Sequence, residues 1–99
     1  MKFSMIYKEG FHSNIKSDFK KIDKSVVEKI KSTHLGIILE DPLIHEKLKG
    51  KLSSFYSYHF TQNKVNYRIA YKIIDDNSIV FYCLIAKREN FYKSLGQRG

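Results

Sequence analysis

The sequence contains little cysteine, proline or glycine: one cysteine, one proline and five glycines in 99 residues. The single cysteine, Cys83, can form neither an internal disulfide nor a cysteine metal cluster, and its apolar neighbours indicate a small buried hydrophobic residue. The chain has no low-complexity tract and no internal repeat. We therefore expect a single domain that spans residues 1–99.

Long hydrophobic runs are also absent. The longest apolar run, residues 79–86, is far too short to span a bilayer, and residues 1–10 lack the apolar core of a signal peptide. The four histidines lack metal-site spacing, and the glycine motifs of nucleotide-binding and serine-hydrolase sites are missing. We therefore expect a cytoplasmic protein that has no membrane partner, no metal and no other cofactor.

Acidic residues are scarce relative to basic ones. Ten Asp and Glu residues against 18 Lys and Arg residues give a formal net charge of +8 and a pI near 9.6. This charge predicts an anionic partner, and RNA, DNA, an anionic membrane or an acidic protein would satisfy it. On charge alone, a basic protein without such a partner stays an open alternative.

The first part of the chain changes from a strand pattern to a helical one. Alternation predicts a strand over residues 2–7, and apolar residues at three- and four-residue steps predict a helix from Phe11. Asp23 is the expected N-cap of a second helix, which ends at Gly36 or continues for another turn. Residues 43–52 are expected to form a loop with a turn of helix.

Three predicted strands follow. Alternation favours a strand over residues 55–60, a turn over residues 61–64, and two strands on either side of the turn signal at residues 75–78. A short helix is expected from Glu89, before a frayed tail at residues 96–99. This order predicts an α+β domain with two N-terminal helices on one face of a mainly antiparallel four-stranded sheet.

Two stretches of this sequence, NYRIAYKI at residues 66–73 and KRENFY at residues 87–92, resemble the RelE/ParE superfamily of bacterial toxins. The stretch HEKLKGKLSSFYSYHF at residues 45–60 is similar to the YoeB branch, whereas the long basic ending is more like RelE. The resemblance covers nearly the whole chain. It implies a RelE-like fold and a ribosome-dependent mRNA endonuclease that works without a metal through the substrate's own 2′-hydroxyl.

The resemblance also assigns roles. Glu46 falls on the catalytic glutamate of the YoeB branch and is the expected base, with a solvated loop carboxylate as the alternative. Arg68 falls on the catalytic arginine and is the expected phosphate clamp, since its fork of donors can hold two phosphoryl oxygens. The resemblance also makes Lys87, Arg88 and Tyr92 catalytic candidates. His59 is a further candidate on chemical grounds, because a histidine can donate or accept a proton near neutral pH. The expected RNA-binding lysines are Lys47, Lys49, Lys51 and Lys72.

Strand geometry orders these candidates. Arg68 and Lys72 are expected on an exposed face, opposite the apolar residues of the same strand. Lys87 and Arg88 point to opposite faces of a regular strand, so only one lies beside Arg68; we expect Arg88, with Lys87 as the acid or a second clamp. A solvated charge pair is the alternative for both, and packing within the terminal helix is the alternative for Tyr92.

Three functions stay open for such a chain. The resemblance favours an mRNA endonuclease, whose partners would be the ribosome, mRNA and a cognate acidic antitoxin. The ParE branch shares the fold but poisons gyrase without cutting RNA, so the fold alone does not decide between them. The third alternative is a degenerate member that only binds its antitoxin, and a homodimer is open in each case.

Overall fold

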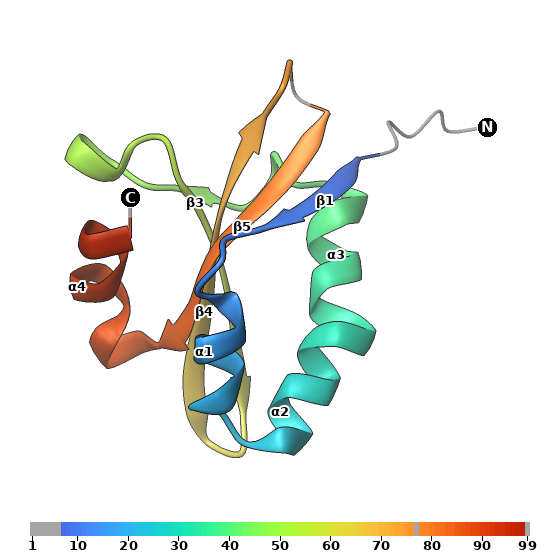
Figure 1. Cartoon of the computed structure of the whole chain (residues 1–99), viewed down its shortest axis with the longest axis vertical. Helices are drawn as coiled ribbons and strands as arrows, with labels where there is room; N and C mark the ends of the chain where they lie inside the picture. Colours follow the sequence, from blue (N-terminus) through green and yellow to red (C-terminus); the bar gives the residue numbers. More distant parts are fainter. Residues whose placement is uncertain (1–6, 77, 99) are drawn as a thin grey trace.

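The structure, a computed structural model, describes residues 7–76 and 78–98 (Figure 1). Its strands form one five-stranded sheet in the order β1-β5-β4-β3-β2, antiparallel except for β1, which pairs parallel with β5. The α+β class is confirmed, but the expected four-stranded sheet is wrong. In chain order the elements are β1 (Lys8–Phe11), α1 (Ile15–Lys20), α2 (Lys24–Lys29), η1 (Ile30–His34), α3 (Leu35–Glu40), β2 (Glu46–Lys47), η2 (Gly50–Leu52), β3 (Tyr56–Gln62), β4 (Val65–Ile74), β5 (Ile79–Lys87) and α4 (Arg88–Arg98).

The first strand begins later than predicted. Of the predicted strand, residues 2–6 lie outside the described residues. The strand β1 instead runs from Lys8 through Phe11, the residue at which we expected the first helix to begin. Gly10 lies inside β1. A Cβ at this position would lie 2.8 Å from the ring of Phe81, so the absence of a side chain lets β1 approach β5.

The second helix begins at Asp23 as predicted, with the Asp23 carbonyl accepting the N–H groups of Val26 and Val27 at 3.0 Å each. It continues past Gly36, because α2, η1 and α3 follow one another without a break up to residue 40. The middle segment, η1, is a π-helical turn, which inserts an extra residue. Buried positions therefore advance by five residues at this turn, in the series Val26, Ile30, Leu35 and Ile38.

Helices cover both faces of the sheet. On one face, α1, α2 and α3 pack on the predicted core side of β3 and β4, which carries Phe60, Tyr67 and Ile69. On the other face lies α4 (Figure 1). Its Phe91 and Leu95 are fully buried in a second core. The expected single helical layer is therefore wrong, because the sheet also has an apolar surface on its second side. No helix in the described part of the chain is long and apolar enough to span a membrane.

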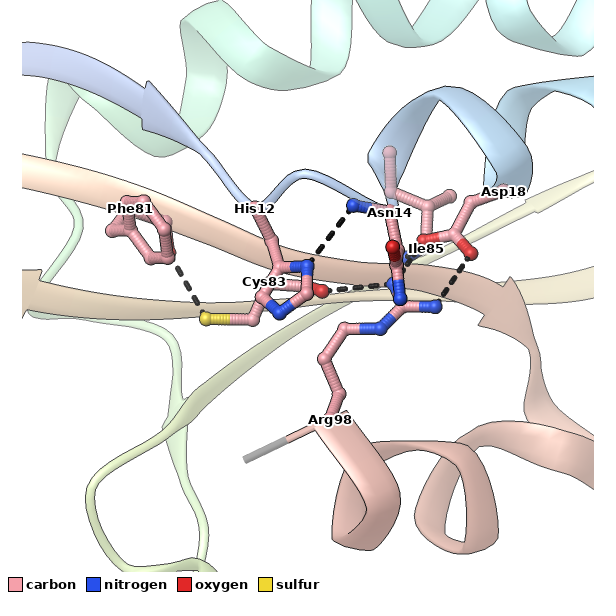
Figure 2. Close-up of polar contacts among 7 residues, drawn as sticks. All are labelled: His12, Asn14, Asp18, Phe81, Cys83, Ile85 and Arg98. Carbon is pink, nitrogen blue, oxygen red and sulfur yellow. Dashed lines mark hydrogen bonds and ion pairs between the residues drawn. The ribbon is translucent and has the colours of Figure 1, made fainter.

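The C-terminal end of α4 is anchored rather than frayed. Arg98 Nη1 donates to Asp18 Oδ2 at 2.6 Å and to the Cys83 carbonyl at 3.0 Å, and Arg98 Nη2 donates to Asp18 Oδ1 at 3.1 Å (Figure 2). The Ile85 N–H also donates to Asp18 Oδ2 at 3.0 Å. Asp18 is only 4% exposed, although it is a charged residue. This network joins α4 to α1 and β5.

Candidate active site

Two adjacent strand pairings bring Glu46 to Arg68. Glu46 lies opposite Ser57 in the β2–β3 pair, and His59 lies opposite Arg68 in the β3–β4 pair. Arg68 Nη1 lies 3.4 Å from Glu46 Oε1 and 3.3 Å from Ser57 Oγ. The expected loop position of Glu46 is wrong, because this residue begins the edge strand β2. The contact between the two residues holds a carboxylate beside a guanidinium on the α4 side of the sheet.

Arg68 is largely covered, contrary to the expected exposed face. Its side chain is 17% exposed, whereas that of Glu46 is 52% exposed. The rings of Phe91 and Tyr92 cover it, each with its centroid 5.8 Å from the guanidinium carbon. Both rings belong to the first turn of α4, which folds back over this face. The cation–π contacts restrict the guanidinium, so its donors are held in place before any ligand binds.

The strand β5 ends at Lys87 and α4 begins at Arg88, so the regular strand assumed for this pair does not continue through Arg88, and both residues line one cavity with Tyr92. Lys87 is paired with Tyr67, whose ring is buried on the opposite face of the sheet. Arg88, the first residue of α4, instead lines a cavity of about 270 Å³ together with Arg68 and His59. The structure therefore brings two arginines and an exposed histidine to one site.

Tyr92 lies next to the Glu46 end of this site. The residue is 49% exposed, and it lines a cavity of about 390 Å³ with Glu46, Lys47 and Lys49. The alternative for Tyr92, packing within the terminal helix, stays open, because its ring centroid lies 5.2 Å from that of the buried Phe91. Tyr92 and Glu46 thus line one depression in the surface.

The expected RNA-binding lysines differ in their surroundings. Lys47 Nζ donates to the Ser53 carbonyl at 2.7 Å, and Lys72 Nζ lies 4.7 Å from the centre of the Phe55 ring. Lys49 lines the Glu46 cavity, and Lys51 is exposed on η2. In the described part of the chain, Lys51 and Lys72 line neither the Glu46 cavity nor the Arg68 cavity.

Two other histidines lie on the opposite face, where they pack against aromatic rings. His34 Nδ1 lies 2.7 Å from the Tyr58 hydroxyl, and its ring stacks on Phe60 with centroids 3.9 Å apart. Burial, and then the charge of Lys29, lowers the pKa of His34. Burial also lowers the pKa of His45, whose Nε2 has no hydrogen-bond partner among the described residues. Sequence patterns did not show that burial lowers the pKa of these two imidazoles.

The site combines the groups that acid–base chemistry on a phosphodiester requires. A carboxylate can take a proton, arginines can stabilise charge on phosphoryl oxygens, and an imidazole or a phenol can return a proton. The buried Ser57 was not among the predicted site residues. Its Oγ accepts a hydrogen bond from Arg68 Nη1 at 3.3 Å. Within residues 7–76 and 78–98, no group of three or more His, Cys, Asp or Glu side chains is placed to hold a metal ion.

Solved bacterial toxins share this fold. A variant of the E. coli toxin RelE with two arginines replaced by alanine, in the free state, superposes with a TM-score of 0.73 at 22% identity, covering 95% of this chain and 94% of that chain. The RelBE2 toxin–antitoxin complex from Mycobacterium tuberculosis has a TM-score of 0.71 at 20% identity, and the match covers 83% of this chain and 98% of that chain. The intact E. coli RelBE toxin–antitoxin complex gives 0.66 at 25% identity, covering 82% and 95%. No curated protein sequence matches the chain.

The fold therefore defines a small RelE-like protein. Residues 10–96 match the family model of the ParE-like toxin of type II bacterial toxin–antitoxin systems. This match covers most of the chain, and the protein belongs to that family. The resemblance to the RelE/ParE superfamily is confirmed, with RelE toxins among its structural relatives.

Proposed function

We propose that this toxin is a ribosome-dependent mRNA endonuclease that inhibits translation. The observation that carries the proposal is the contact between the Glu46 carboxylate and the Arg68 guanidinium, 3.4 Å apart. A base and a phosphate clamp are both needed to cleave RNA through its own 2′-hydroxyl, and here they lie side by side. Arg88, Tyr92 and His59 surround this pair.

In the proposed reaction, Glu46 takes the proton of the 2′-hydroxyl, and the resulting oxygen attacks the neighbouring phosphorus. The bond from phosphorus to the 5′-oxygen breaks, which leaves a 2′,3′-cyclic phosphate on one fragment and a 5′-hydroxyl on the other. Arg68 and Arg88 stabilise the charge that builds up on the phosphoryl oxygens. His59, Tyr92 and Lys87 are the candidate donors of the proton that the 5′-oxygen takes up.

The basic surface supplies the binding energy. Lys47 and Lys49 border the Glu46 cavity and are proposed to contact the mRNA backbone, while Lys51 and Lys72 are proposed to contact RNA outside that cavity. An acidic antitoxin that folds upon binding would complement the net charge of +8. Two of the similar structures are toxin–antitoxin complexes, which supports such a partner. With ribosomes as its target, the toxin would act in the cytoplasm.

Gyrase poisoning without RNA cleavage is the second candidate, and the ParE-like description of the family favours it. The contact between Glu46 and Arg68 favours cleavage instead, because a gyrase poison does not need a base beside a phosphate clamp. A degenerate member that only binds its antitoxin would neither cut mRNA nor block supercoiling.

The purified toxin can separate these functions in two parallel assays. Primer extension on a defined mRNA, with and without ribosomes, measures cleavage, and a plasmid assay measures gyrase supercoiling. We expect cuts that depend on the ribosome, because the ribosome orients the mRNA for in-line attack while free RNA samples many conformations. Blocked supercoiling without cuts would establish the gyrase function, and the absence of both effects would indicate a degenerate member.

A further inference from the structure

A charged cavity of about 570 Å³ adjoins the proposed active site between the tip of the β3–β4 hairpin and the first turn of α4. It shares lining residues with that site, because Arg88 also lines the Arg68 cavity and Tyr92 also lines the Glu46 cavity. Three cations and one carboxylate face the space, so the charge of its wall is positive. The residues used below are Lys64, Asn66, Lys87, Arg88, Glu89 and Tyr92.

Lys64 holds an unusual backbone conformation at the hairpin tip. The two turn residues, Asn63 and Lys64, have φ values of 53° and 65°, in the left-handed region that two-residue hairpin turns require. Asparagine tolerates this region and glycine favours it, whereas a lysine there is strained. Strained residues of this kind occur at functional sites, where the side chain is retained in spite of its backbone cost. Glycine would adopt this backbone conformation without strain but would lack the lysine side chain. The positive charge of that side chain is therefore the candidate for a function.

Asn66 adds neutral donors to the same wall. Its Oδ1 accepts a hydrogen bond from Thr61 Oγ1 at 2.7 Å. This contact fixes the orientation of the side-chain amide and leaves the two N–H groups of Nδ2 as donors. Amide donors beside lysine ammonium groups are typical ligands for the non-bridging oxygens of a phosphodiester.

We propose that this cavity binds a second phosphodiester of the RNA strand, next to the scissile one, with Lys64 as the main cationic ligand and Lys87 beside it. The inference rests on the proposed function, because Arg68 and Arg88 are taken to hold the scissile phosphate. The carboxylate of Glu89 reduces the positive charge of the cavity wall without reversing it. The site therefore suits the single negative charge of a phosphodiester. Because phosphate contacts do not read bases, Lys64 would raise affinity for any RNA sequence.

The test measures binding to a fluorescent, fully 2′-O-methylated oligoribonucleotide, which cannot be cleaved, by anisotropy at several salt concentrations. Lys64→Gly removes the charge and also relieves the backbone, so a folding defect is not expected. Lys64→Arg keeps the charge. Lys29→Ala removes one charge from an exposed position on α2, far from the cavity in the sequence, and is the matched control.

We expect Lys64→Gly to weaken binding about five- to tenfold and to reduce the salt slope of log K by about 0.7, the value for one lost contact to a single strand. Lys64→Arg should bind like the parent, and Lys29→Ala should change affinity less than twofold. Equal losses in Lys64→Gly and Lys29→Ala would overturn the subsite, since they would show a general charge effect. So would a Lys64→Gly variant that keeps its RNA affinity but loses affinity for an acidic antitoxin.

The same proteins separate the subsite from the proposed function. If Lys64→Gly loses RNA affinity and the parent cuts no mRNA on ribosomes, the phosphate subsite stands and the endonuclease fails. If the parent cuts mRNA, Lys64→Gly should raise the KM of cleavage and leave kcat nearly unchanged, because the contact is made equally in the ground state and the transition state. An unchanged KM together with unchanged probe binding would overturn the subsite alone.

Discussion

Arg98 at the end of α4 and Asp18 in α1 form a bidentate ion pair between residues 80 positions apart, with N–O distances of 2.6 and 3.1 Å (Figure 2). Their side chains are 12% and 4% exposed. The first turn of α4 carries Arg88 and Tyr92 to the proposed active site, and its last turn carries Arg98. The position of the site therefore depends on a contact made at the opposite end of the same helix.

Replacing Asp18 tests this dependence. Asp18→Asn leaves the Arg98 guanidinium without its charge partner, and loss of one partner of a buried pair costs on the order of 3 kcal/mol in the free energy of unfolding. Cys83 is buried in the core beneath α4, and burial raises the pKa of its thiol to about 11, so iodoacetamide should label the parent slowly. We expect faster labelling of Cys83 in the variant and a lower urea midpoint.

Asp76→Asn is the matched control, because Asp76 is exposed at the β4–β5 turn and asparagine tolerates its φ of 55°. It should leave both the labelling rate and the urea midpoint unchanged. Equal labelling rates in Asp18→Asn and the parent would show that the ion pair does not hold α4 in place.

Replacing Arg68 tests the phosphate clamp. Arg68→Ala removes the guanidinium beside Glu46, and loss of such charge stabilisation should lower the cleavage rate by about two to three orders of magnitude. The cost in stability should be small, about 1 kcal/mol from lost cation–π packing on Phe91 and Tyr92. Arg68→Lys keeps the charge without the fork and should retain part of the activity. A folded Arg68→Ala variant that cuts at the parental rate would show that Arg68 is not the phosphate clamp.

Stability should fall in mild acid because of His34 and His45. Burial lowers the pKa of both imidazoles below 6.5 in the folded state, so the unfolded chain binds more protons in this range. Their contribution is complete above about pH 6.5 and is lost as the pH falls through the folded-state pKa values. Lys29 adds to the shift of His34; at His45, Asp41 opposes the shift and His59 adds to it.

The measurement for this prediction is the urea midpoint between pH 7.5 and pH 5.5. The double variant His34→Gln with His45→Gln should show a weaker decrease than the parent, and His12→Gln should follow the parent. A double variant with the parental pH dependence would assign the effect to other groups.

The antitoxin prediction concerns the basic surface. Expression of the toxin alone should inhibit growth, and co-expression with the acidic protein from a neighbouring reading frame should restore it. The two proteins should co-purify in a complex whose affinity falls as salt increases, since charge attraction drives their association. Growth without inhibition, together with purification of the toxin free of any companion, would argue against a toxin–antitoxin pair.

The sequence predicted the elements better than their contacts. Alternation and turn signals located β3, β4 and β5, and the resemblance singled out both Glu46 and Arg68. Local patterns could not show that residues 46–47 form an edge strand, because that strand exists only through its pairing with β3. The continuation of the helix past Gly36 likewise depends on tertiary contacts. The π turn shifts the helix by one residue, and this shift places Leu35 in the core.

The second layer of the fold was missed for a similar reason. Arg98 lies in a stretch with the composition of a frayed tail, and Asp18 lies among basic residues on a helical polar face. Only the tertiary structure brings Arg98 and Asp18 together. The same packing places α4 over Arg68. The strain at Lys64 was equally hidden, because a lysine in a turn gives no sign of a positive φ.

The central claim is that Glu46 acts as the base beside Arg68, and the most direct test is the single-turnover cleavage rate of Glu46→Gln on mRNA-programmed ribosomes. Glutamine keeps the size of the side chain and an oxygen that can accept from Arg68, but it cannot take a proton. The account predicts a cleavage rate reduced by about 10²–10⁴ relative to the parent, with ribosome binding at least as strong because the net charge rises by one. A Glu46→Gln variant that cleaves at the parental rate would contradict it.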